Sequence, residues 1–163
     1  MPSPKGYSRT QIALHWAVAV LIVLQFVLHE PIAHAWDQVK DGLAVDFSPL
    51  VAVHVFGGVL VLAFALWRLA LRKTRGAPPP PAAEPAPLKM AAQIGHLALY
   101  ALMILMPVSG AAAWFGGVDF AAEVHEAMKP ALLILVAVHV AASLWHQFWL
   151  KDGLMLRMKR AED

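Results

Sequence analysis

Cysteine is absent from the 163 residues of this chain, and charged residues make up only 15% of it. The lack of cysteine excludes disulfide bonds, iron–sulfur clusters, zinc sites with thiolate ligands and a cysteine nucleophile. The chain also has no duplicated segment. In contrast, 60% of the residues are hydrophobic, and the mean hydropathy is +0.60. These values exclude an ordinary water-soluble domain and predict a membrane protein.

Four long apolar stretches predict four membrane-spanning helices. Their expected bounds are about residues 9–28, 50–71, 90–115 and 124–150. The first stretch could instead be a secretory signal cleaved near Ala33, but its apolar run exceeds the length of about 7–15 residues that is typical of a signal core. We therefore expect an all-α fold: an integral membrane four-helix bundle that forms a single membrane domain over residues 1–163.

Three polar segments connect the expected spans. His29–Ser48 is predicted to be a loop, with a short surface helix as the alternative. Residues 75–89 begin with RGAPPPPAAEPAP, a proline-rich linker that is expected to be extended and to act as a spacer rather than a signalling ligand. Gly116–Glu123 is predicted to be a short turn.

Charge differs between the two ends of the expected bundle. The termini and the proline-rich linker carry eleven basic and four acidic residues, whereas the other two loops carry two basic and seven acidic ones. By the positive-inside rule, both termini and the linker are predicted to be cytoplasmic. The pI near 9.1 is thus a topology signal, and no nucleic acid is expected as a partner.

The eight histidines are the main metal-ligating residues of the chain. His125 and His139 leave the same face of the fourth span, separated by about 21 Å of helix rise, whereas His146 follows His139 by only about 10.5 Å, which is short for two stacked porphyrins. By depth, His15 can meet His139 in the cytoplasmic half, and His54 can meet His125 near the outer face.

Each such pair offers two neutral imidazoles from facing helices, which suits six-coordinate haem iron with no open position. Two haem groups are therefore predicted, with irons about 20 Å apart. Gly57 and Gly58 lie on the face of His54, where a porphyrin could approach the backbone. The alternatives are hydrogen bonds between helices, or a zinc or copper site, although the pairs are too far apart to form one tetrahedral cluster.

Several short motifs occur in a characteristic order along the chain. They are YSRTQIALHW from Tyr7, HVFGG from His54, RLALR from Arg68, GHLALY from Gly95, LMPVSG from Leu105 and LWHQFWLKDGLMLRM from Leu144. In this order the chain resembles the bacterial cytochrome b561 family, four-helix di-haem proteins of the inner membrane. The resemblance implies two haem b groups, ligated by His15 with His139 and by His54 with His125.

The resemblance further implies a quinone site lined by His96 and His146, with ubiquinone as the electron acceptor. Contact with haem propionates, or simple packing, is the alternative for both histidines. Arg9, Arg68 and Arg72 could pair with propionates or with anionic lipid headgroups. The expected location is the bacterial inner (cytoplasmic) membrane, with membrane lipid as the surroundings of a multi-pass protein.

Among the members of the family, the motifs are most similar to those of superoxide oxidases, which pass electrons from superoxide at the outer face to ubiquinone. Lys129, one turn after His125, is the candidate entry point for superoxide. The acidic outer loops oppose an anionic substrate and favour the alternative, a quinol-linked carrier to a periplasmic redox protein. A haemless membrane protein whose histidines join helices is the third hypothesis.

Overall fold

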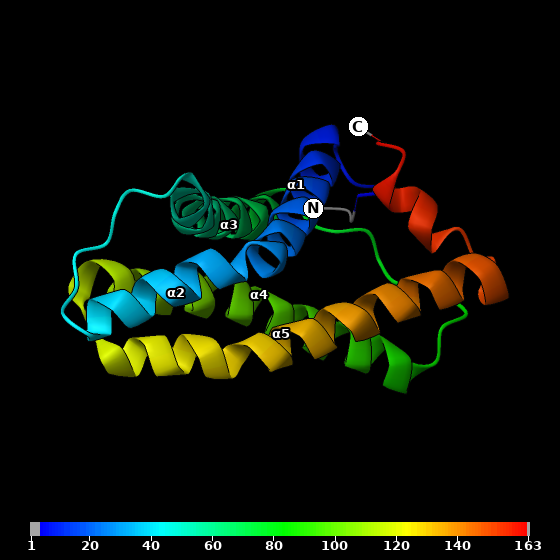
Figure 1. Ribbon diagram of the computed structural model, residues 1–163. Coiled ribbons are helices and arrows are strands. Elements are labelled where there is room, and N and C mark those ends of the chain that lie inside the picture. Colours follow the sequence, from blue (N-terminus) through cyan, green and yellow to red (C-terminus); the bar gives the residue numbers. More distant parts are fainter. Residues whose placement is uncertain (1–3, 163) are drawn as a thin grey trace.

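The computed structural model describes residues 4–162, in which the secondary structure is helical and includes no strand. Five α-helices are followed by a π-helix and a 3₁₀ helix (Figure 1): α1 (Arg9–Val27), α2 (His29–Lys40), α3 (Pro49–Thr74), α4 (Ala86–Gly116), α5 (Asp119–Trp145), η1 (His146–Leu150) and η2 (Leu154–Met158). By length and composition, α1, α3, α4 and the continuous segment of α5 and η1 can each cross a membrane. The predicted all-α fold with four apolar spans is thus confirmed.

A capping box begins α1. The Ser8 hydroxyl accepts the Gln11 N–H at 3.2 Å, and the Gln11 side-chain oxygen accepts the Ser8 N–H at 3.0 Å. The other end of the same amide, Gln11 Nε2, donates to the Gly76 carbonyl at 3.1 Å. One glutamine therefore starts the first span and also holds the beginning of the proline-rich segment against it.

The proline-rich linker is shorter than the sequence predicted. Helix α4 begins at Ala86, so the expectation of extended chain up to Pro87 and of a linker up to residue 89 was wrong. Pro87 lies in the first turn of the helix, where no intrahelical hydrogen bond needs its missing N–H, and Pro85 is the N-cap. Residues 76–85 remain non-helical, as proline-rich sequence favours.

Both connections at the opposite end are more helical than a plain loop. The short surface helix considered as the alternative for His29–Ser48 is present as α2, with an acidic first turn and a basic last turn that suit the helix dipole. The turn between α4 and α5 is shorter than expected, because α5 begins at Asp119. Gly117 makes this tight turn possible: its φ of 65° lies in the left-handed region, and its N–H donates to the Ala113 carbonyl at 2.9 Å.

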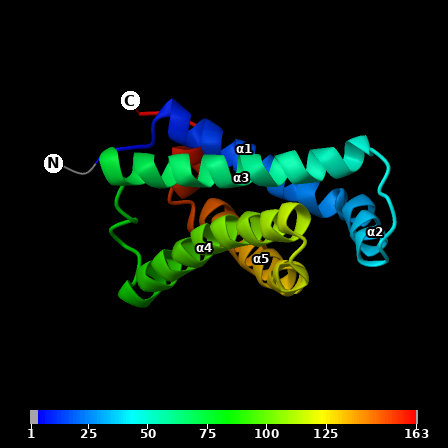
Figure 2. The same ribbon diagram turned by 90° about the vertical axis from the view of Figure 1, so that its left-hand side faces the viewer.

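Two layers make up the bundle (Figure 2): α1 with α3, and α4 with α5. Both termini and residues 76–85 lie at one end, which we call the terminal end, while α2 and the α4–α5 turn lie at the other, the α2 end. The buried core joins α1, α3 and α4 through Val18, Val61, Ala65 and Met103. Within residues 4–162, α5 packs extensively on α4 and has no comparable contact with α1 or α3. His15 and His54, from the α1–α3 layer, face His139 and His125 of α5 across the interior between them.

The C-terminal segment closes over the terminal end. Trp16 Nε1 donates to the Met158 carbonyl at 2.8 Å, and the Glu162 N–H donates to the Tyr7 carbonyl at 3.1 Å. Arg157 Nη1 donates to the Pro79 carbonyl at 2.6 Å. These contacts tie η2 to the start of α1 and to the proline-rich segment.

Candidate functional site

The structure brings the four histidines expected to ligate haem into two facing pairs. The ring centres of His15 on α1 and His139 on α5 are 6.2 Å apart, with the ring planes at 55°. Those of His54 on α3 and His125 on α5 are 6.5 Å apart, at 65°. The first pair belongs to the terminal end and the second to the α2 end, so α5 supplies one histidine to each.

These separations fit two imidazoles on opposite sides of one metal. A histidine nitrogen binds a metal at about 2.0 Å, and the ring centre lies roughly 1.1 Å behind it, so the two centres would be about 6.3 Å apart. His96 also meets His139, but at 5.4 Å the two rings are too close for a metal between them. The described residues hold no group of three or more metal-ligating side chains that could hold a bare ion. Both wider pairs therefore fit haem better than a metal cluster.

His125 is held with one nitrogen turned away from its partner. Its Nδ1 donates to the Met106 carbonyl at 2.8 Å, and the Ser109 hydroxyl donates to the same carbonyl at 2.9 Å. Gly110 leaves room for the ring, because a Cβ there would lie 3.0 Å from His125 Nδ1. With the proton on Nδ1, the lone pair is on Nε2, which is the form of histidine that binds iron.

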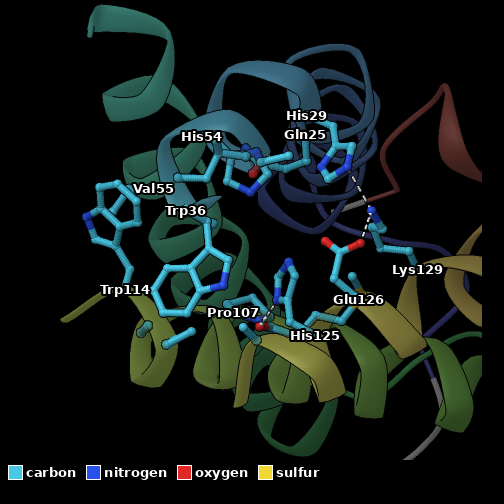
Figure 3. A pocket seen from close by; sticks show the side chains of 18 of the residues that line it. Gln25, His29, Trp36, His54, Val55, Pro107, Trp114, His125, Glu126 and Lys129 are labelled. Atoms are coloured by element: carbon cyan, nitrogen blue, oxygen red, sulfur yellow. Dashed lines mark hydrogen bonds and ion pairs between the residues drawn. The ribbon is translucent and has the colours of Figure 1, made fainter. Parts of the chain in front are cut away.

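A cavity of about 640 Å³ surrounds the pair at the α2 end and is lined by both His54 and His125. This volume is within the range of about 300–1,000 Å³ that is usual for ligand and cofactor cavities. Trp36 from α2 and Trp114 from α4 form part of its wall (Figure 3). The cavity thus combines an apolar aromatic wall with two facing imidazoles.

The two glycines that follow His54 differ in their surroundings. Gly58 lines the cavity, and a Cβ added there would meet nothing within 4 Å. Gly57 is buried and receives the side-chain amide of Gln25 from α1. The expectation that both glycines admit a porphyrin is therefore wrong for Gly57, because an amide already fills that space.

Arg68 contacts one histidine of the pair at the terminal end. Its Nη2 donates to His15 Nδ1 at 3.2 Å, and its guanidinium lies 5.6 Å from the centre of the Tyr100 ring. An arginine is always protonated, so His15 Nδ1 accepts this bond and the proton of a neutral ring is on Nε2. His15, unlike His125, is therefore not held in the form that binds iron through Nε2.

His146 lies apart from the histidine cluster that His96 joins. Its Nδ1 is 2.5 Å from Asp152 Oδ2 and its Nε2 is 3.6 Å from Glu84 Oε1. Burial raises the pKa of Asp152, but the Leu154 N–H and the His146 ring outweigh it, and the net pKa is lowered. His146 thus links the end of α5 to the proline-rich segment through two carboxylates.

Lys129 lines the cavity at the α2 end and already has two partners. It forms an ion pair with Glu126, and its Nζ donates to His29 Nε2 at 2.8 Å (Figure 3). Lys40 is paired likewise with Asp37 at 2.7 Å, and this hydrogen bond lowers the pKa of Asp37. Four carboxylates and these two lysines line the cavity, so its polar rim is acidic.

Reasoning from the histidines alone missed several residues of the site. The Met106 carbonyl and Ser109 contact His125, and Gln25 lies beside His54. For Gln25 a signal was available: it is an uncharged polar residue inside an apolar span, and polar groups within a membrane are costly unless they have a partner. A backbone carbonyl gives no such signal in a sequence.

Known proteins resemble this chain along nearly its whole length. The family model described as prokaryotic cytochrome b561 matches residues 6–161. Cytochrome b562 of Cereibacter sphaeroides is 37% identical, covering 98% of this chain and 99% of that protein. Probable superoxide oxidase CybB of Yersinia pestis is 28% identical (94% and 96%), and cytochrome b561 homolog 1 of Escherichia coli is 26% identical (93% and 96%).

Proposed function

Because the chain belongs to the prokaryotic cytochrome b561 family of haem b membrane electron carriers, we propose that it holds two haem b groups and carries electrons between the outer face of the inner membrane and ubiquinone. His15 with His139 would hold the haem at the terminal end, which faces the cytoplasm, and His54 with His125 the haem at the α2 end. The observation that carries this proposal is the pair of ring separations, 6.2 and 6.5 Å. Two imidazoles on one iron need about 6.3 Å.

Haem iron held by two imidazoles supplies one-electron redox chemistry without an open position for a substrate. The chain's own residues supply the orientation. The Met106 carbonyl holds His125, and the apolar cavity wall excludes water. At the terminal end, Arg68 must release His15 Nδ1 for His15 to bind iron through Nε2. The released guanidinium would then be free to pair with a haem propionate.

The reaction at the outer face would be the oxidation of superoxide. Two superoxide anions give two molecules of O2 and two electrons, and one ubiquinone takes these electrons with two protons to become ubiquinol. His96, in contact with His139, would hydrogen-bond a quinone carbonyl and pass a proton to it. His146 is occupied by two carboxylates, so its role at the quinone site would be to relay a proton rather than to bind the ring.

A second candidate function follows from the charges of the outer rim. Four carboxylates line the cavity, and both of its lysines are paired with acids. Such a rim repels an anion and attracts a basic protein surface. In this case electrons would run from quinol outward to a basic redox protein.

The test is a spectrum of the purified protein with haem counted per chain. Two haems are expected in the intact chain and one in each of His54→Ala and His139→Ala, while His146→Ala, the matched control on the same helical segment, should keep two. Rapid reduction by a superoxide pulse, with reoxidation by ubiquinone, supports the first candidate. Reduction by ubiquinol alone supports the second, and a colourless protein would overturn both.

A further inference from the structure

Gln25 and His54 each have a buried polar side-chain atom at the cavity wall that lacks a hydrogen-bond partner among the described residues. Gln25 lies near the end of α1, and its atom is the amide Nε2. On the facing helix α3, the atom of His54 is the ring Nδ1. Buried polar atoms in proteins nearly always have partners, so two such atoms on one cavity wall call for an explanation.

Both groups lie close together. Gln25 and His54 line the same cavity, and Figure 3 shows their side chains next to each other. The backbone of Gln25 also approaches the His54 ring, although without the geometry of a hydrogen bond to Nδ1, and is the competing acceptor. The amide of Gln25 fills the space left by Gly57, one turn after His54 on the same face of α3. A larger residue at position 57 would displace this amide, so glycine there keeps it beside the histidine.

We infer that Gln25 is a positioning residue that accepts a hydrogen bond from His54 Nδ1 when His54 holds the outer haem. This inference rests on the proposed ligation of that haem by His54. Once Nε2 binds iron, the proton of a neutral imidazole is on Nδ1 and needs an acceptor. A half-turn of the Gln25 amide exchanges Nε2 for the side-chain oxygen, and that Nε2 has no hydrogen bond to lose.

The two outer ligands would then be supported in different ways. His125 donates to a backbone carbonyl, that of Met106, which no substitution removes. His54 would donate to a side chain, which can be changed. A stronger acceptor on Nδ1 makes the imidazole more basic and stabilises ferric iron, so this contact would tune the midpoint potential of the outer haem.

The test is a potentiometric titration of the whole haem-loaded protein, together with the electron paramagnetic resonance of its ferric state. Gln25→Leu should raise the equilibrium constant for reduction of the outer haem about tenfold, which is about 59 mV for a one-electron couple. Gln25→Glu should lower it. Gly57→Ala should act like Gln25→Leu, because its methyl group would take the place of the flexible amide.

Two controls accompany these variants. The inner haem reports on general damage in the same sample and should not shift. Leu24→Ala changes the neighbouring residue of α1, which is 39% exposed, and should leave both potentials unchanged.

The role of Gln25, the role of Gly57 and the ligand assignment of His54 each have one result that would overturn it. Unshifted outer potentials in Gln25→Leu and Gly57→Ala, with both haems retained, would mean that the Gln25 backbone or no group at all serves His54. A shift in Gln25→Leu alone would contradict the role given to Gly57. If His54→Ala keeps the outer haem with unaltered resonance, the ligand assignment itself is wrong, which is a failure of the proposed function and is distinguishable from the first two.

Discussion

Gly110 is the position where the smallest change should act on the outer haem. A Cβ added there would lie 3.0 Å from Nδ1 and 3.1 Å from Cε1 of His125, and contacts this short require the ring to move by a few tenths of an ångström. The bond from His125 Nδ1 to the Met106 carbonyl is 2.8 Å, so such a shift would stretch it to about 3.2 Å, the limit of a good hydrogen bond. Gly110→Ala should therefore weaken both the position and the hydrogen bond of one ligand.

The expected loss follows from the values known for groups that orient metal ligands, whose removal costs about 10-fold to 100-fold in affinity. Because Gly110→Ala strains the hydrogen bond without removing its acceptor, we expect the lower value, about tenfold or about 1.4 kcal/mol. The assay is transfer of haem to an excess of apomyoglobin, followed by visible absorption, with haem counted per chain at the start. The outer haem should leave about ten times faster than in the unaltered protein.

Gly95→Ala is the matched control, since it lies on the same helix and a Cβ there would meet nothing within 4 Å. It should leave both haems in place. Equal haem transfer from Gly110→Ala and Gly95→Ala would refute the reasoning, because it would show that the packing of Gly110 against His125 does not support the ligand.

Asp152→Asn should destabilise the protein by about 0.5–1 kcal/mol at pH 7, after allowance for solvent screening. Because the native pKa of Asp152 is lowered, the difference should shrink as pH falls below the ordinary carboxyl value of 3.8 and vanish below the lowered native pKa; a pH-independent difference in thermal unfolding would contradict this origin. Lys129→Gln should slow haem reduction by superoxide about twofold to threefold if the anion enters there, measured by stopped flow, and an unchanged rate would exclude that route. Trp16→Phe removes the hydrogen bond to the Met158 carbonyl, so tryptic cleavage after Lys159 should become about five times faster; an unchanged cleavage rate would mean that this bond does not hold the segment.

The sequence was sufficient to predict the fold because its strongest signal is one of length and hydropathy. An apolar run long enough to cross a bilayer specifies a helix, since every backbone polar group must then be satisfied within the segment. The errors lie at the ends of helices. Pro87 and Asp119 both belong to first turns, where proline and acidic side chains are compatible with a helix as well as with a loop.

Less of the candidate site could be predicted. Helix periodicity and depth are properties of one chain segment at a time, and they were enough to propose which histidines face each other. The contacts of Arg68 with His15, of Gln25 with Gly57 and of Lys129 with His29 join residues that are distant in sequence. Each depends on the rotation of one helix against another, for which the amino-acid pattern carries no direct signal.

The closure of the C-terminal segment over the start of α1 has a consequence for biosynthesis. Trp16 leaves the ribosome before its partner Met158, which is made 142 residues later. The three segments that meet at the terminal end can be joined only after the last span has been synthesised. Until then the first span lacks the bond from Trp16 to Met158 and that from Glu162 to Tyr7. A nascent chain that stops before η2 should therefore expose the beginning of α1 to quality-control proteases, even when all four spans are already in the membrane.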